Sequence, residues 1–331
     1  MTSKIIALVG GAGFIGTNLS NRLKKNNISH EIFDLKTSFN SNNDIIPINV
    51  EDPNSLDKLK HADTIVNLAA VHTDNVFPIS RYDDVNVGGA INICDSARKH
   101  NIKKIIFTSS VAIYGFAAPN TDETGSPNYF NDYGRTKFLA ENVYKKWHSE
   151  DPKNRKLVIL RPTVIFGKGN RGNIYNLFKK IASKQFIMFG DGKNRKSIAY
   201  VENFVSFIEF CLSFQEGLHV YNYVDKPDYD MNTLVKEVRK ILFKKNNIGL
   251  RFPAFLGLSI GYLADIINRV FGAKLTISSV RVKKFMSTTQ FSTSISKINF
   301  IPPKSLKEAL YSTIKYEFLE DNKEKKEFIT E

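Results

Sequence analysis

A glycine-rich turn between a short apolar run and a helix-like segment constrains this chain more than any other feature. The apolar run Ile5–Val9 leads directly into the segment 10–16, which reads GGAGFIG. The first glycine of such a turn allows a tight bend, the second lets the backbone approach a pyrophosphate, and the third lets the helix pack against the strand. The N-terminus of the following helix offers unpaired N–H groups to phosphates. We therefore expect a dinucleotide at Gly10, Gly13, Phe14, Ile15 and Gly16.

An acidic residue at the end of the second predicted strand indicates which dinucleotide is bound. Asp34 follows that strand and lies 18 residues beyond Gly16. A carboxylate at this place binds the ribose 2′-hydroxyl and repels a 2′-phosphate. The sequence therefore favours NAD over NADP as the cofactor.

Short apolar runs alternate with helix-length segments along the first two thirds of the chain. Continuous apolar strands that alternate with helices are typical of a parallel sheet covered on both faces. The sequence therefore predicts an α/β fold, a Rossmann-type doubly wound parallel sheet with a smaller C-terminal substrate lobe. The predicted strands are Ile5–Val9, His30–Phe33, Ile45–Ile48, Thr64–Leu68, Lys104–Thr108, Leu157–Leu160 and Val220–Val224. The predicted helices are Phe14–Asn26, Val87–Lys99, Tyr133–Trp147 and Val201–Phe214.

The pattern loosens after Gly167, where Gly, Asn and Lys interrupt the apolar periodicity. We expect an NAD-binding domain over 1–167 and a mainly substrate-binding, basic lobe over 168–320. The strand near 219–224 is expected to return to the sheet of the first domain. The segment 321–331 is rich in Lys and Glu and predicts a frayed, charged tail.

The charge of the chain points to an anionic partner. The formal net charge is +14, and the sequence pI is about 9.5. The segment 240–284 alone contains nine basic residues and one acid, Asp265. Nucleic acid, an anionic membrane surface and a phosphorylated substrate all fit such a charge. Nucleic acid is not expected, because the basic run lacks the interleaved surface aromatics on which bases stack.

An uncharged stretch inside the basic run leaves two interpretations open. The residues Phe252–Ala264 contain no charge, and they are fewer than the ~20 that a membrane-spanning helix needs. Flanked by Arg251 and Arg269, the stretch suits an interfacial helix on an anionic membrane leaflet. An ordinary core helix of the substrate lobe fits the sequence equally well.

The two cysteines and the N-terminus bear on the cellular compartment. Cys94 and Cys211 both lie in apolar patterns, which predicts buried free thiols and suits a reducing cytoplasm. The apolar run at the N-terminus has five residues and leads into glycines, so it reads as a strand and not as a signal peptide. No metal-ligand spacing of His and Cys is apparent, and no metal is expected.

A tyrosine and a lysine one helical turn apart predict acid–base chemistry. Tyr133 and Lys137 have the i, i+4 spacing that places both on one helix face. A free phenol has a pKa of about 10, so a tyrosine base near pH 7 needs about 4 kcal/mol of anion stabilisation. A neighbouring ammonium and a positive nicotinamide ring supply that stabilisation. Ser110 follows the fifth predicted strand, where doubly wound folds present ligand-binding groups.

Taken together, these motifs resemble the extended short-chain dehydrogenase/reductases, the group of UDP-galactose 4-epimerase. The similarity includes the glycine turn, the Ser-Tyr-Lys set, and segments that run nearly from end to end: 67–70, 84–87, 160–162, 190–192 and 200–203. The resemblance implies tightly held NAD and catalytic roles for Ser110, Tyr133 and Lys137. It further implies that cofactor contacts come from Asn49, Val50, Leu68, Ala69, Ala70, Asn86, Tyr133, Lys137 and Pro162.

Two positions after the serine distinguish reactions within this group. The 4,6-dehydratases carry Asp and Glu there, and this chain has Val111 and Ala112. Dehydration is therefore disfavoured, and the resemblance implies epimerisation at C4 through a 4-keto sugar.

The late part of the chain departs from the nucleotide-sugar epimerases. The Arg-x-Gly-Asp-like element that holds UDP in those enzymes is missing, and Arg161 lacks their Asn three residues later. The segments 161–167, 170–177, 221–228 and 278–285 resemble instead the bacterial epimerases that convert lipid-linked GlcNAc, on diphospho-undecaprenol, to GalNAc before O-antigen assembly. On this resemblance we expect substrate contacts from His72, Ser110, Thr163, Asn173, Lys196 and Arg281.

This resemblance also implies where the protein works and with what. The partners are then a lipid-linked sugar diphosphate and an anionic membrane surface, at the cytoplasmic side of the inner membrane, with peripheral attachment. A homodimer through the helices near 87–99 and 133–147 is a further expectation. The alternatives are a soluble UDP-hexose or UDP-HexNAc 4-epimerase or sugar reductase, and an NAD-sensing or RNA-binding protein whose function survives Tyr133→Phe.

Overall fold

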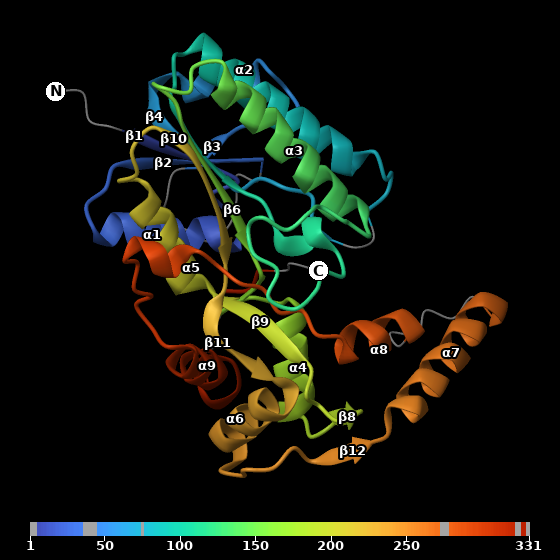
Figure 1. Ribbon diagram of the computed structural model, residues 1–331. Helices are drawn as coiled ribbons and strands as arrows, with labels where there is room; N and C mark the ends of the chain where they lie inside the picture. Colours follow the sequence, from blue (N-terminus) through green and yellow to red (C-terminus); the bar gives the residue numbers. More distant parts are fainter. Residues whose placement is uncertain (1–4, 36–44, 74–75, 272–277, 322–325, 329–331) are drawn as a thin grey trace.

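The computed structural model describes residues 5–35, 45–73, 76–271, 278–321 and 326–328, and it shows a parallel sheet between two layers of helices (Figure 1). The strand order is β10-β6-β5-β4-β1-β2-β3, and every neighbouring pair is parallel. This is the predicted doubly wound sheet, with its order reversing between β1 and β4. The strands are β1 (Ile5–Val9), β2 (His30–Asp34), β3 (Ile45–Pro47), β4 (Ala62–Asn67), β5 (Lys104–Thr108), β6 (Lys156–Pro162) and β10 (Gly217–Tyr223).

Helices cover both faces of this sheet because the apolar side chains of its strands point alternately to each side. One core joins the strands to α2 and α3, and it includes the buried Trp147 and Cys94. The other core joins them to α1 and α5 and includes the buried Cys211. Both cysteines are free thiols, as predicted. The helices are α1 (Phe14–Lys25), α2 (Gly89–Lys99), α3 (Asp132–Ser149) and α5 (Val201–Cys211).

A second lobe follows the sixth strand of the sheet. Its core is formed by apolar residues such as Phe178, Met188 and Leu310, which are fully buried. The strand β10 leaves this lobe and pairs with β6 through all seven of its residues. The lobe consists of β7 (Val164–Phe166), α4 (Asn173–Ala182), β8 (Ile187–Phe189), β9 (Arg195–Tyr200), β11 (Asp225–Asp230), α6 (Met231–Phe243), β12 (Leu250–Phe252) and α9 (Leu306–Ile314).

Two helices, α7 (Ala254–Phe271) and α8 (Ser279–Met286), form an arm that extends from the second lobe (Figure 1). The helix α7 buries only Gly257, Gly261 and Ala264. A Cβ on Gly261 would lie 2.8 Å from the backbone of Ser279, so the small residue allows α7 and α8 to touch closely. The core-helix interpretation of the uncharged stretch is therefore wrong, and the helix is also longer than that stretch.

The exposed surface of α7 is apolar over most of its length. Its 18 residues have a mean hydropathy of 1.3, and α7 is the one helix of the described ranges long and apolar enough to cross a membrane by length and composition. Leu263 and Ile266 are each 58% exposed. The other exposed large side chains are Phe255, Leu256, Ile260, Tyr262, Val270 and Phe271.

Part of the segment expected to fray is held in place. Phe328 pairs with the loop after β7, where its N–H donates to the carbonyl of Gly169 and its carbonyl accepts from Arg171. Its ring lies 5.5 Å from the ring of Phe14. The structure thus differs from the expected frayed tail over 326–328, because an aromatic anchor outweighs the charged residues around it.

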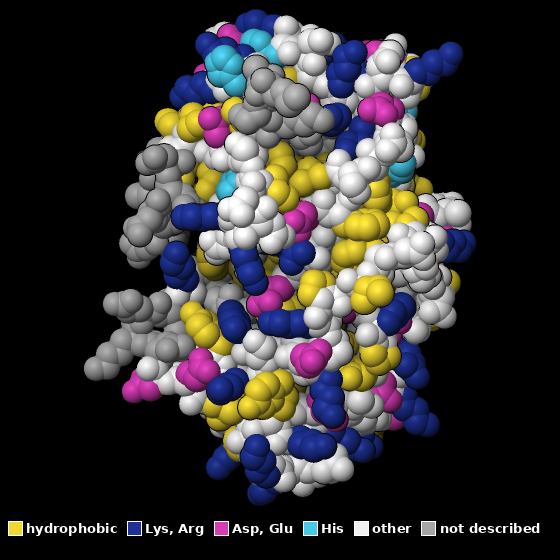
Figure 2. Space-filling view, turned by 90° about the vertical axis from the view of Figure 1, so that its left-hand side faces the viewer, with side chains coloured by type: hydrophobic (Ala, Val, Ile, Leu, Met, Phe, Trp, Pro, Cys, Tyr) yellow, Lys and Arg dark blue, Asp and Glu magenta, His cyan; other side chains and the backbone are white. Residues whose placement is uncertain are grey.

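Positive charge is not confined to the basic run 240–284, of which Lys274 lies outside the described residues. Figure 2 shows Lys and Arg side chains across the face of α1 and α9, with more of them toward the lower end of the molecule. Apolar side chains lie between them. On this face the basic side chains are therefore spread out among apolar and acidic ones and do not form a single patch.

Candidate functional site

A cavity of about 700 Å³ opens at the carboxyl ends of the sheet strands. Doubly wound folds bind ligands at this edge, next to the place where the strand order reverses. One side of the cavity is formed by the glycine turn and the residues after β2 and β4, and the other by β7, the start of α4 and the end of α8. Ser110, Tyr133 and Lys137 lie between the two sides and line the cavity.

The glycine turn has the geometry that its sequence predicts. Gly10 has φ of +76°, and a Cβ there would lie 2.6 Å from the backbone of Ala69. A Cβ on Gly16 would lie 2.5 Å from Gly11, so the helix can approach the strand only without one. A Cβ on Gly13 would meet only the carbonyl of Gly10, at 3.4 Å. Its free side faces the cavity, which leaves the space that a pyrophosphate needs.

Asp34 combines two roles at the end of β2. Its Oδ2 accepts a hydrogen bond from the N–H of Ala12 at 3.0 Å, which ties the glycine turn to the second strand. The same side chain lines the cavity. The glycine turn, the helix start at Phe14 and this carboxylate fit the phosphates and a ribose of NAD. Of the residues expected to contact the cofactor, those on the cavity wall are Gly10, Gly13, Phe14, Ile15, Gly16, Asp34, Asn49, Val50, Leu68, Ala69, Ala70, Tyr133, Lys137 and Pro162.

Asn86 is the expected cofactor residue that lies behind the cavity wall. It belongs to a π-helical turn, Asp83–Gly88, and is 5% exposed. Its Oδ1 accepts from the N–H of Val71 at 2.9 Å, and its Nδ2 donates to the carbonyl of Val71 and to Thr136 Oγ1, both at 3.0 Å. Asn86 therefore holds the loop after β4 against α3, and it acts on the site through the residues that it positions.

The Ser-Tyr-Lys set comes from two elements that meet at the cavity. Ser110 begins a 3-10 turn after β5, and Tyr133 and Lys137 lie on the first turns of α3. Burial raises the pKa of Tyr133 above its usual value, and a hydrogen bond with Ser110 opposes that rise. Burial also lowers the pKa of Lys137 to about 7, and its Nζ lies 4.4 Å from the centroid of the Phe107 ring.

A buried ion pair supports this set from behind. Arg161 donates two hydrogen bonds to Glu141, at 2.8 and 2.7 Å, and Ser109 Oγ donates to the same carboxylate at 2.6 Å. Burial would raise the pKa of Glu141, but the bonds from Arg161 keep it below its usual value. Glu141 lies one turn after Lys137, so the pair fixes α3 against β5 and β6. Sequence reasoning missed Glu141, whose one visible signal is its i, i+4 spacing from Lys137.

The expected substrate residues fall into two groups. His72, Ser110, Thr163 and Asn173 line the cavity. Lys196 and Arg281 do not lie on its wall. Arg281 is exposed in the first turn of α8, and the residue of that helix which reaches the cavity is Lys284, almost one turn later.

Lys196 lies behind the cavity wall, where its ammonium contacts the backbone of another helix. Its Nζ donates to the backbone carbonyls of Lys284 at 2.9 Å and Ser287 at 2.5 Å. The last carbonyls of a helix have no partner within the helix and attract cations. Lys196 therefore binds the C-terminal end of α8, and burial lowers its pKa to about 8.

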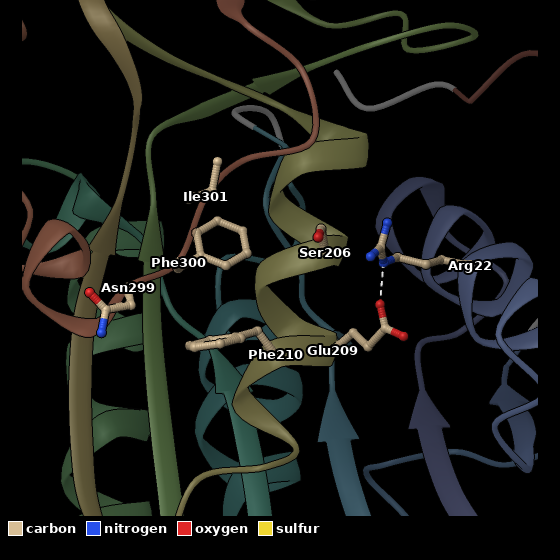
Figure 3. Close-up of a pocket in the computed structure, with 7 residues that line it drawn as sticks. All are labelled: Arg22, Ser206, Glu209, Phe210, Asn299, Phe300 and Ile301. Atoms are coloured by element: carbon tan, nitrogen blue, oxygen red, sulfur yellow. Dashed lines mark hydrogen bonds and ion pairs between the residues drawn. The ribbon is translucent and has the colours of Figure 1, made fainter.

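A smaller hollow lies between α1 and α5, away from the carboxyl ends of the strands (Figure 3). Its two charged side chains, Arg22 and Glu209, point toward each other and form an ion pair. Asn26 donates a further hydrogen bond to Glu209. Because its charges are matched within the hollow, we assign no chemistry to it. The other lining residues are Ser206, Phe210, Asn299, Phe300 and Ile301.

Comparison with known proteins agrees with this geometry. The profile of the NAD dependent epimerase/dehydratase family matches residues 6–223. The chain is 44% identical to the N-acetyl-alpha-D-glucosaminyl-diphospho-ditrans,octacis-undecaprenol 4-epimerase of Escherichia coli O157:H7, over 98% of this chain and 99% of that protein. It is 26% identical to the UDP-glucose 4-epimerase of Vibrio cholerae, over 81% of this chain and 86% of that protein.

Solved structures show the same fold at lower identity. The UDP-glucose 4-epimerase of Thermotoga maritima, solved with UDP-glucose, has a TM-score of 0.73 at 21% identity, over 94% of this chain and 98% of that one. The UDP-N-acetylglucosamine 4-epimerase of Bacillus cereus has a TM-score of 0.73 at 16% identity, with the same coverage.

Proposed function

Because the chain belongs to the NAD dependent epimerase/dehydratase family, we propose that it inverts C4 of an N-acetylglucosamine linked through a diphosphate to undecaprenol. The observation that carries the proposal is the contact between Ser110 and Tyr133 in the cavity, with Lys137 one turn away. The 44% identity over nearly the whole chain supports this substrate in preference to a nucleotide sugar. The product is the lipid-linked GalNAc.

The chain's own residues manage the proton of the reacting hydroxyl. The glycine turn and Asp34 would hold NAD, which would supply the hydride acceptor and donor for the sugar carbon. Tyr133, as the phenolate, takes the hydroxyl proton and later gives it back to the same oxygen. Ser110 hydrogen-bonds the phenol and holds the sugar oxygen in place. Lys137, when protonated, stabilises the phenolate, since an ammonium one helical turn away favours the charged form.

The absence of acids beside Ser110 supports epimerisation over dehydration. Val111 and Ala112 both line the cavity at the positions that follow the serine. Neither side chain can take up or give a proton, so these two positions supply no group for eliminating water. The sugar keeps its 6-hydroxyl, and turning it over within the cavity presents its other face to the cofactor.

The arm formed by α7 and α8 supports work at a membrane. An exposed apolar helix beside Lys283 and Arg281 is the arrangement that binds anionic membrane surfaces. Asp265 of α7 accepts a hydrogen bond from the N–H of Ser279 at 3.1 Å, so one side of α7 stays bound to α8. We infer peripheral attachment at the cytoplasmic side of the inner membrane, in the synthesis of O-antigen or another surface polysaccharide. The outer faces of α2 and α3 are where we place a homodimer contact.

The test is epimerisation by the purified protein of radiolabelled GlcNAc-diphospho-undecaprenol and of UDP-GlcNAc, assayed side by side. We expect conversion of the lipid-linked sugar alone, reduced about 10³-fold or more by Tyr133→Phe, which removes the acid–base group. Tyr129→Phe, a tyrosine before α3 that lies outside the cavity wall, is the matched control. Conversion of UDP-GlcNAc alone would overturn the proposal and favour a soluble nucleotide-sugar epimerase. Unchanged turnover in Tyr133→Phe would remove the assigned acid–base role.

A further inference from the structure

At the mouth of the cavity, two aromatic side chains stack on each other with much of their surface in solvent. Phe116 and Phe130 have ring centroids 4.9 Å apart, with 30° between their planes. They are 58% and 47% exposed, and Phe130 also lines the cavity. Exposed aromatic surface at the rim of a site provides apolar contact area for a ligand that extends out of it.

The loop that carries this pair is fixed by its backbone. Gly115, directly before Phe116, has φ of +60°, and a Cβ on it would lie 1.9 Å from the carbonyl oxygen of Asn128. The N–H of Asn128 donates to the carbonyl of Ile113 at 2.8 Å. The backbone that carries both rings is therefore fixed at the rim before any ligand arrives, which limits the entropy cost of binding.

A cation lies against the same pair. Lys284 of α8 lines the cavity, and its Nζ lies 4.7 Å from the centroid of the Phe130 ring. Within the described ranges, no carboxylate forms an ion pair with Lys284. The neighbouring Lys283 points the other way, with its Nζ 5.3 Å from the ring of Tyr262 on α7. The helix α8 thus joins the rim of the cavity to the exposed apolar face of α7.

We infer that Lys284 and the stacked pair Phe116–Phe130 form a binding site for the diphosphate and the first isoprene units of a polyprenyl diphosphosugar. The inference rests on the proposed function and names the parts of the chain that recognise the lipid carrier. The sugar lies at Ser110 and Tyr133, its diphosphate meets the Lys284 ammonium at the mouth, and the hydrocarbon leaves over the aromatic pair. Lys196 is a positioning residue here, because it holds the backbone of Lys284.

The experiment compares three detergent-dispersed substrates with the full-length enzyme: GlcNAc-diphospho-undecaprenol, a GlcNAc-diphosphate carrying a single C5 isoprenyl group, and UDP-GlcNAc. Lys284→Gln is expected to raise KM about tenfold for both prenyl substrates with kcat within about twofold, which is the loss of one charge-assisted contact. Lys284→Arg is expected to restore KM to within about threefold. Lys180→Gln, an exposed lysine on α4, is the control with the same change of charge.

The aromatic pair is tested by chain length. Phe116→Ala is expected to raise KM for the undecaprenyl substrate severalfold more than for the C5 analogue, because the longer chain loses apolar contact. An equal effect on both substrates would overturn the assignment of the rim to isoprene units. If Lys284→Gln has the same KM for the prenyl substrates as Lys180→Gln, the diphosphate site is overturned and the proposed function stays intact. Wild-type enzyme that converts only UDP-GlcNAc would overturn both.

Discussion

The sheet and the arm treat apolar residues in opposite ways. Along the sheet, apolar side chains are buried between strands and helices, and residues such as Leu8, Ile105 and Val158 have no exposed surface. On α7, apolar side chains of similar size face solvent, and only small residues are buried. The first arrangement gains stability from burial at about 25 cal/mol per Å². The apolar side chains of α7 do not contribute this stability within the chain, which is consistent with the proposed contact of the arm with a membrane surface.

The largest expected loss of stability comes from a change in the interior of the sheet and its covering helices. Glu141→Gln would leave the Arg161 guanidinium buried without its anion, and we expect the free energy of unfolding to fall by about 3–5 kcal/mol. Urea unfolding followed by circular dichroism measures this. Asp95→Asn removes one partner of an exposed ion pair with Arg98 and should cost at most about 1 kcal/mol. If both variants lose the same free energy of unfolding, the buried pair does not stabilise the packing of α3 against the sheet.

The next prediction concerns the contact between Lys196 of the second lobe and α8 of the arm, and it uses the pH dependence of stability. In the folded chain the pKa of Lys196 is about 8, below its ordinary value of 10.5, because burial disfavours the charged form. Between these values the unfolded chain binds a proton that the folded chain does not. The free energy of unfolding therefore rises by about 3 kcal/mol as the pH rises from about 8 to about 10. Below pH 8 Lys196 is charged in both states, and the full free-energy cost of burying that charge lowers the stability of the folded chain.

Lys196→Met isolates this contribution. We expect the difference in unfolding free energy between wild type and variant to shift in favour of wild type as pH rises through this window. Urea unfolding at pH 7.5 and pH 10 measures the shift, since the other titrating groups are common to both proteins. If the unfolding free energies of the two proteins change with pH in the same way, the protonation of Lys196 does not affect the stability of the folded chain.

The smallest effect concerns the arm alone. Leu263→Asp places a charge on the exposed face of α7, and we expect the bound-to-free ratio on phosphatidylglycerol vesicles to fall about tenfold. Flotation measures binding, and a thermal scan should show little change, because an exposed side chain contributes little to folding. Ile301→Asp, at an 84% exposed site in the loop before α9, should bind vesicles like wild type. If both variants bind equally, the arm is not the membrane contact.

The two regions also differ in how much their sequences revealed. The sheet strands were predicted to within about three residues, because their apolar runs are continuous and bounded by turn residues. Tyr133, Lys137 and Ser110 were expected to lie together because two of them share one helix and the third follows a strand end, and all three line one cavity. Their catalytic roles stay predictions. For α7, length and hydrophobicity do not distinguish a buried core helix from an exposed one. What decides between them is the neighbouring surface, which depends on chain segments far away in sequence.

The position of Lys284 on the cavity wall, where the sequence suggested Arg281, has a similar cause. Arg281 and Lys284 lie on one short helix, almost a full turn apart, and the sequence does not indicate how that helix is docked. Its orientation depends on Lys196, which lies 88 residues earlier than Lys284 and binds its backbone carbonyl. The partnership of Glu141 with Arg161 was hidden for the same reason, since it joins a helix to a strand and follows no short motif.

Because β10 comes after much of the second lobe in the sequence, the chain cannot be cut into two pieces that each contain one complete lobe. The chain leaves the sheet after β6, builds much of the second lobe, and only then supplies the strand that pairs with every residue of β6. A fragment cut at residue 167 would present β6, buried along its whole length in the intact protein, as a bare apolar edge. Such edges recruit strands from other molecules. Exchanging the second lobe between relatives therefore requires grafting two discontinuous segments, one on each side of α5 and β10, because both of these elements belong to the sheet half of the fold.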